Sequence, residues 1–86
     1  MARMRSKPKI IRESLGYSLQ EVGEAIEVHP TMLSRLENNK RKWTLTLALA
    51  WIEWAEEEVK NARDRGQKIP VSHFPSMDDL ARMGVS

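Results

Sequence analysis

Residues 18–37 carry two short helical patterns with only three residues between them, and this spacing constrains the fold more than any other stretch. The apolar residues of the first pattern recur on one helix face: Leu19, Val22 and Ile26. The second pattern begins at Pro30, which is favoured in a first turn because its missing N–H would have no helical partner there. Residues 27–29 leave room only for a turn, so the helices must cross steeply, and Gly23 is the small residue at the crossing.

Helix-start signals divide the rest of the chain. Ser18 with Glu21 three residues later forms a capping-box pattern, and Ser76 with Asp79 repeats it. Thr44 is a candidate N-cap before a long run without Pro or Gly. Besides the helix that starts near residue 19, the sequence predicts four helices, over residues 8–15, 30–38, 45–65 and 76–83.

The apolar, small and turn residues between about Ile11 and Ile52 form one ungapped pattern. Its members are Ile11, Arg12, Glu13, Gly16, Tyr17, Ser18, Val22, Gly23, Ile26, Val28, Leu33, Ser34, Arg35, Leu36, Glu37, Lys40 and Arg41. This pattern resembles the helix-turn-helix of phage repressors and Cro, the xenobiotic-response-element-like family. The resemblance implies an all-α, repressor-type domain of four helices, here with the fourth helix extended and a short C-terminal helix added. It also implies binding to double-stranded DNA.

Three positions depart from the family's usual residues. Leu19 stands where the family often has Gln, and Gln20 follows it. Gly23 replaces the usual Ala, at about 1 kcal/mol of helix stability. Glu27 occupies the turn position that usually holds a left-handed Gly, where a residue with a Cβ is strained.

The helix over residues 30–38 is predicted to read DNA. Leu33 and Leu36 set its buried side, so other side chains point outward or sit at its N-terminal tip. The base-reading candidates are His29, Thr31, Met32, Ser34 and Arg35. Arg35 can form two hydrogen bonds to a guanine edge. An ordinary surface role is the alternative for each of these residues taken singly.

Cations gather where the DNA backbone would pass. Residues 1–43 hold nine Lys and Arg against five Asp and Glu, a net charge of +4, whereas residues 44–86 carry −2. The predicted phosphate contacts are Ser18, Gln20, Asn38, Asn39, Lys40 and Arg41, with Arg3 and Arg5 from a flexible basic arm over residues 1–7. The alternatives are a solvated charged surface and an arm without a role.

The resemblance also implies an ion pair. In the family, an Arg at the position of Arg12 often pairs with the Glu that ends the reading helix, here Glu37. Such a pair would link the first helix to the reading helix. The alternative is two separate, exposed charges.

The long helix over residues 45–65 has two apolar stripes. We expect the first, made by Leu45, Ala48, Leu49 and Ile52, to close the core of the domain, which spans residues 8–66. The second stripe consists of Leu47, Trp51 and Trp54, and it would then stay exposed. We expect it to form a dimer interface together with Phe74 from the tail. We expect the tail over residues 67–86 to be a dimerisation element, which packs either on its own long helix or on a partner's.

Several protein classes find no support in the residues. The chain has no Cys, no apolar run of membrane-spanning length, no signal-peptide pattern and no Gly-rich phosphate loop. We therefore expect a cytoplasmic protein that is not an enzyme and uses no metal, cofactor or small-molecule ligand.

The favoured function is that of a homodimeric repressor on an inverted repeat. Family members of this size often come from phages and other mobile elements, whose own operons they repress. An antitoxin-like interaction module that uses the Trp stripe and the tail is the alternative.

Overall fold

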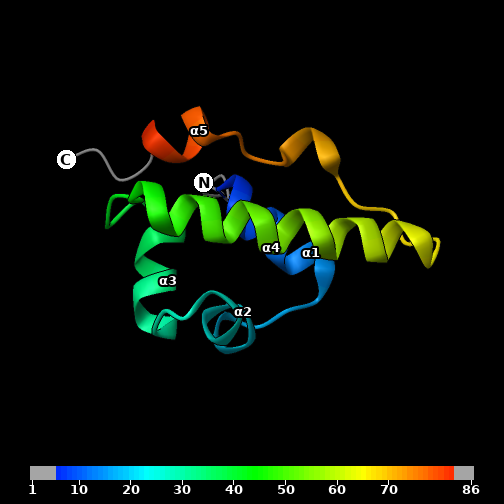
Figure 1. Ribbon diagram of the computed structural model, residues 1–86, viewed down its shortest axis with the longest axis horizontal. Helices are drawn as coiled ribbons and strands as arrows, with labels where there is room; N and C mark the ends of the chain where they lie inside the picture. The colour runs from blue at the N-terminus through cyan, green and yellow to red at the C-terminus, as the bar shows by residue number, and fades with distance from the viewer. Residues whose placement is uncertain (1–5, 83–86) are drawn as a thin grey trace, which may run out of the picture.

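A computed structural model describes residues 6–82, and this part of the chain is helical, without strands (Figure 1). Its elements are α1 (Lys7–Leu15), α2 (Leu19–Ile26), α3 (Pro30–Glu37), α4 (Leu45–Asp64), the one-turn 3-10 helix η1 (Val71–His73) and α5 (Met77–Arg82). The all-α fold with a long fourth helix is thereby confirmed. None of these helices is long and apolar enough to cross a membrane.

Side-chain caps fix where the helices begin. Ser18 and Glu21 form the predicted capping box, in which each side chain accepts a hydrogen bond from the other residue's backbone N–H. Ser76 and Asp79 repeat this arrangement before α5. Ser6 caps α1, which therefore includes Lys7, a residue that the sequence assigned to the arm. The remaining bounds lie within a residue of those predicted.

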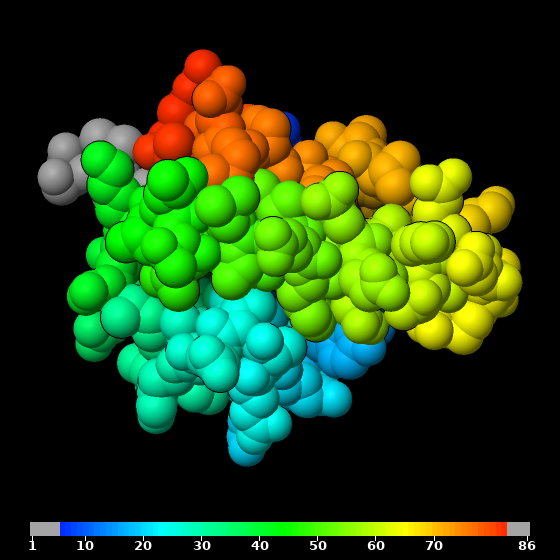
Figure 2. Space-filling model, in the orientation of Figure 1, coloured from blue at the N-terminus to red at the C-terminus, as the bar shows by residue number. Residues whose placement is uncertain are grey.

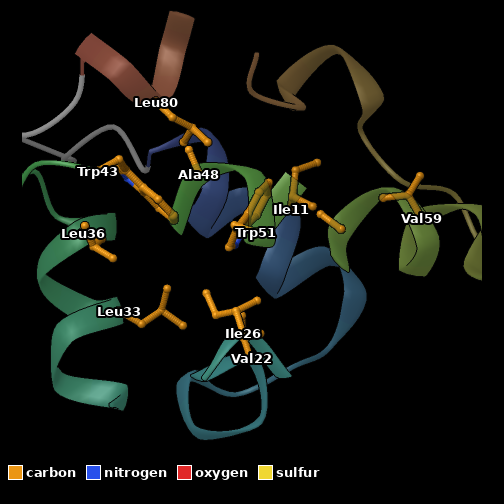
Figure 3. Close-up of a cluster of buried hydrophobic side chains, with 11 residues drawn as sticks. Ile11, Val22, Ile26, Leu33, Leu36, Trp43, Ala48, Trp51, Val59 and Leu80 are labelled. Carbon is orange, nitrogen blue, oxygen red and sulfur yellow. The ribbon is translucent and has the colours of Figure 1, made fainter. Parts of the chain in front are cut away.

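The long helix α4 runs across the whole molecule, with α1 behind it and α2 and α3 below (Figure 1). Side chains from all of these helices meet on one face of α4, around Trp51, which is fully buried (Figure 3). Trp51 lies 6.2 Å from Trp43, 6.0 Å from Trp54 and 5.8 Å from Phe74, measured between ring centroids. Edge-on and tilted contacts of this kind add to the free energy gained from burying the rings.

The expected use of the two stripes on α4 is wrong in part: Ala48 is buried in the core and Ile52 packs against it, as expected, but three other residues differ. Leu45 and Leu49, which we expected in the core, are 68% and 44% exposed. Trp51, expected on an open dimer surface, is 0% exposed. Leu47 and Trp54 are half-buried beside the core. Trp51 is therefore not available to the alternative interaction module, whereas Leu47 and Trp54 keep part of their surface.

The tail explains this difference. After α4 it turns back and covers the helix on its own subunit, with Phe74 against Trp51 and Leu80 fully buried (Figure 1). A salt bridge of 3.1 Å between Lys7 Nζ and Asp79 joins α5 to the start of α1. Phe74 and Leu80 of the tail therefore pack in the chain's own core, on the side of α4 that the sequence analysis expected to be open.

Candidate nucleic-acid interface

The turn between α2 and α3 is unusually close to Gly23. A Cβ at this position would lie 2.5 Å from the carbonyl oxygen of Val28, a distance that real Cβ atoms do not show. The backbone N–H of Val28 also donates to the carbonyl of Gly23, at 2.8 Å. Glu27 takes the left-handed conformation at φ 61° and ψ 44°, so the family's turn geometry is kept without its glycine. These contacts fix how α3 leaves α2.

The helix α3, which the sequence predicts to read DNA, has one buried and one open side. Leu33 and Leu36 are fully buried, and they point from α3 toward the core (Figure 3). Among the predicted base-reading residues, His29, Thr31 and Arg35 are exposed, and Met32 and Ser34 are half-buried. The structure thus brings four of the five to the open side or the N-terminal tip of one short helix, whereas Met32, at its edge, packs partly against the core.

His29 caps α3, and this contact decides which nitrogen of its neutral ring carries the hydrogen. Its Nδ1 accepts a hydrogen bond of 3.1 Å from the backbone N–H of Thr31. An accepting Nδ1 carries no proton, so the neutral ring bears its hydrogen on Nε2. The exposed side chain is therefore a hydrogen-bond donor at the tip of the helix.

The segment after α3 is polar, basic and exposed. Asn38 donates to the Ser34 carbonyl at 2.8 Å, and Asn39 is left-handed at φ 60°. Lys40, Arg41 and Lys42 then follow with exposed side chains. We call residues 38–42 the basic loop.

Trp43 anchors the basic loop, a role that the sequence analysis missed. The residue is 4% exposed and packs edge-on against Trp51 in the core. A lone aromatic residue at the end of a polar, basic run is the signal that could have indicated it. Because Trp43 is fixed, the cations just before it are held beside the C-terminal end of α3.

An ion pair joins the reading helix to α1. Arg12 Nε and Nη2 donate to the two carboxylate oxygens of Glu37, at 2.7 and 3.0 Å, and both residues are buried. Arg12 Nη1 donates in addition to the Tyr17 carbonyl, at 2.9 Å. Arg12 therefore holds the end of α3 and the segment before α2 at the same time.

The remaining predicted phosphate contacts are at the start of α2 and in the arm. Ser18 and Gln20 are exposed there, and the Ser18 hydroxyl already accepts the Glu21 N–H. Arg3 and Arg5 lie outside the described residues.

The comparison with protein families decides the identity of this arrangement. A family model described as Helix-turn-helix matches residues 9–53, more than half of the chain. The chain belongs to this family. It is a helix-turn-helix protein of the xenobiotic-response-element type. Neither the curated proteins nor the solved structures gave a match.

Membership of the helix-turn-helix family indicates the general function of this protein. The family consists of DNA-binding transcription regulators rather than enzymes. The matched segment contains α2, α3 and the basic loop, and it ends within α4. The last turns of α4 and the tail of this helix-turn-helix protein lie outside the matched segment.

Proposed function

We propose that this protein is a homodimeric transcriptional repressor that binds an inverted repeat in double-stranded DNA. One observation carries the proposal: the polar, open side of α3 continues directly into the exposed cations of the basic loop. A helix with this chemistry fits a major groove, and cations at its end fit the phosphates that border the groove. Repression would be steric, because an occupied operator excludes polymerase.

Base reading is assigned to the open side of α3. Arg35 can donate two hydrogen bonds to O6 and N7 of a guanine, the commonest specific contact in DNA complexes. The Nε2–H of His29 is a single donor that suits a base or phosphate acceptor near the helix start. Thr31 and Met32 can contact thymine methyl groups, and Ser34 can bond either kind of base edge.

Phosphate binding is assigned to the residues on either side of α3. Lys40, Arg41, Asn38 and Asn39 form one group in the basic loop, and Ser18 and Gln20 form the other at the start of α2. Arg3 and Arg5 belong to the proposal as arm contacts. These groups fix the position of α3 on the duplex without reading sequence.

The homodimer follows from the amount of DNA that one helix can read. A single α3 contacts only a few base pairs, and repressors of this kind gain affinity by placing two copies on adjacent half-sites. The proposal includes an operon of a phage or other mobile element as the target, as for many repressors of this family, and a place in the cytoplasm.

The test is selection of bound sites from a random DNA library. We expect the parent chain to select an inverted repeat that contains a guanine in each half-site. Arg35→Ala should weaken binding to that site by about 1–3 kcal/mol and relax the preference at one position per half-site. Arg63→Ala, on an exposed position far along α4, is the matched control and should bind normally. Selection of no sequence at all by the parent would refute the proposal.

A further inference from the structure

Two exposed leucines on the first turns of α4 have no function in the fold. We propose that Leu45 and Leu49 form the contact through which two copies of this chain pair on DNA. The proposal rests on the DNA-binding function above, and it replaces the Trp stripe as the dimer surface.

The leucines lie beside a small apolar hollow. Leu45 is 68% and Leu49 44% exposed, on the side of α4 that faces away from Trp51. Next to them is a hollow of about 120 Å³, lined by Trp43, Thr44, Leu45, Ala48, Met77 and Ala81. Trp43 and Ala48 meet Leu80 of α5 behind this surface (Figure 3). A projecting leucine next to an apolar hollow is self-complementary, as the contact of a twofold dimer must be.

The position of the leucines suits the spacing of half-sites. Two reading helices one DNA turn apart are separated by about 34 Å, so each lies about 17 Å from the twofold axis. The first turns of α4 and the end of α3 lie at the same end of the molecule (Figure 1), with only residues 38–44 between them. The Asp64 end of α4 is roughly 28 Å farther along the helix. A dimer built there would place the reading helices much farther apart.

Charges on either side of the leucines favour pairing with a second copy. The cations Arg41 and Lys42 precede Leu45, and the exposed acids Glu53 and Glu56 follow Leu49 on the same side of α4. If the two α4 helices ran parallel, equal charges would face each other across the twofold axis. If they run antiparallel, the cations of one copy face the acids of the other. Charge complementarity therefore selects the antiparallel arrangement.

The proposed contact between the two copies buries little surface, so we expect it to form mainly when both copies are bound to DNA. Two leucines and one hollow cover much less than the roughly 800 Å² per partner that a standard stable interface buries. The space-filling view shows α4 as a convex ridge along the front of the molecule, with the tail beside it (Figure 2). We therefore expect copies that are mostly separate when free and that pair on neighbouring half-sites, where DNA holds them close together.

The experiment compares binding to one half-site with binding to the full inverted repeat. The variant is Leu45→Gln with Leu49→Gln, because Gln keeps helix propensity and neither position is buried. It should bind one half-site as the parent does and lose at least tenfold in affinity for the repeat. Val71→Gln, at an apolar residue that is 51% exposed on η1, is the matched control and should change neither value. A double variant that binds the repeat as tightly as the parent would overturn the proposal.

Sedimentation without DNA separates this proposal from the proposed function. At high concentration the parent should self-associate, and the leucine variant should not. Glu53→Lys should weaken the association, Lys42→Glu combined with Glu53→Lys should restore it, and Glu24→Lys, at an exposed position of α2, should leave it unchanged. If the parent selected no DNA but still associated through these leucines, the proposed pairing surface would be supported and the proposed DNA-binding function would be refuted. A parent that stays monomeric and binds the repeat without cooperativity would overturn the pairing surface, leaving the leucines to another partner.

Discussion

Arg12 and Glu37 bind each other through two hydrogen bonds, although 25 positions separate them in the chain. Because Glu37 is the last residue of α3, the pair fixes the end of the reading helix to α1. The third hydrogen bond of Arg12, to the Tyr17 carbonyl, extends this link to the segment before α2. The orientation of the open side of α3 thus depends on a buried charge pair outside the predicted DNA contacts.

We predict that Glu37→Ala destabilises the domain by about 3–5 kcal/mol, because the guanidinium of Arg12 would stay buried without its partner. In a domain of this size the melting temperature should fall by more than about 10 °C. Arg12→Met with Glu37→Leu should cost less than the single change, since no charge stays behind. Glu24→Ala, at an exposed position of α2, is the control. A Glu37→Ala melting temperature within a degree or two of the parent would contradict the prediction.

We predict that Gly23→Ala destabilises the protein, although Ala is the better helix former by about 1 kcal/mol. The new Cβ would lie 2.5 Å from the Val28 carbonyl oxygen, so the turn would have to move. Overpacking of this kind typically costs about 1–3 kcal/mol. Ala25→Gly, at an exposed position of the same helix, measures the propensity difference alone. A stabilised Gly23→Ala variant would show that the turn yields easily.

Glu27→Gly should have the opposite effect. The left-handed conformation costs an ordinary L-residue roughly 1–2 kcal/mol, whereas Gly adopts it freely. We expect a gain in stability of about 1 kcal/mol or slightly less, since Gly also makes the unfolded chain more flexible. Glu24→Gly, within α2, should instead lose about 1 kcal/mol. Chemical denaturation of both variants provides the comparison, and equal losses would contradict the prediction.

Neutralising the basic loop should weaken all DNA binding in the same way. Lys40→Gln or Arg41→Gln should lower affinity for the selected site and for random DNA by similar factors. Each should also reduce the slope of log affinity against log salt by about 0.9 for every phosphate that the protein no longer neutralises. Lys68→Gln, at an exposed position of the tail, should do neither. A loss confined to the selected site would mean that the loop reads bases.

The attachment of α5 should weaken in acid. The backbone N–H of Ser76 and then the Lys7 ammonium lower the pKa of Asp79 below its usual value. A lowered folded-state pKa stabilises the fold above the unfolded value, near 3.9, and this contribution is lost as pH falls from there through the lowered pKa of the folded state. Between pH 6 and about pH 3, Asp79→Asn should therefore lose less stability than the parent. Thermal melts over this pH range provide the measurement, and an Asp79→Asn variant that loses as much stability as the parent would contradict the prediction.

The parts of the fold that depend on neighbouring residues were predictable from the sequence. Ser18 with Glu21 and Ser76 with Asp79 form caps over three residues, and Pro30 sets the start of α3. The outward side of α3 follows from the buried spacing of Leu33 and Leu36. These features needed no knowledge of how distant segments pack.

The use of α4 was not predictable in this way. A helix with apolar residues on several sides does not reveal which side is covered, because that depends on segments elsewhere in the chain. Phe74 and Leu80 of the tail settle the question by covering the side that contains Trp51. Leu45 and Leu49 stay exposed because they lie on a side of α4 that the tail does not cover.

The burial of Leu80 has a consequence for dissecting the protein. A fragment cut after Arg65 would keep every residue of the matched family module and would still lose part of its core, together with the Lys7–Asp79 bridge. We therefore do not expect α3 and its flanking helices alone to fold correctly when they are transferred to another protein. Chimeras that test whether α3 sets DNA specificity should exchange its side chains within the intact chain, since Leu80 of α5 packs in one cluster with Trp43 and Ala48 at the start of α4 (Figure 3).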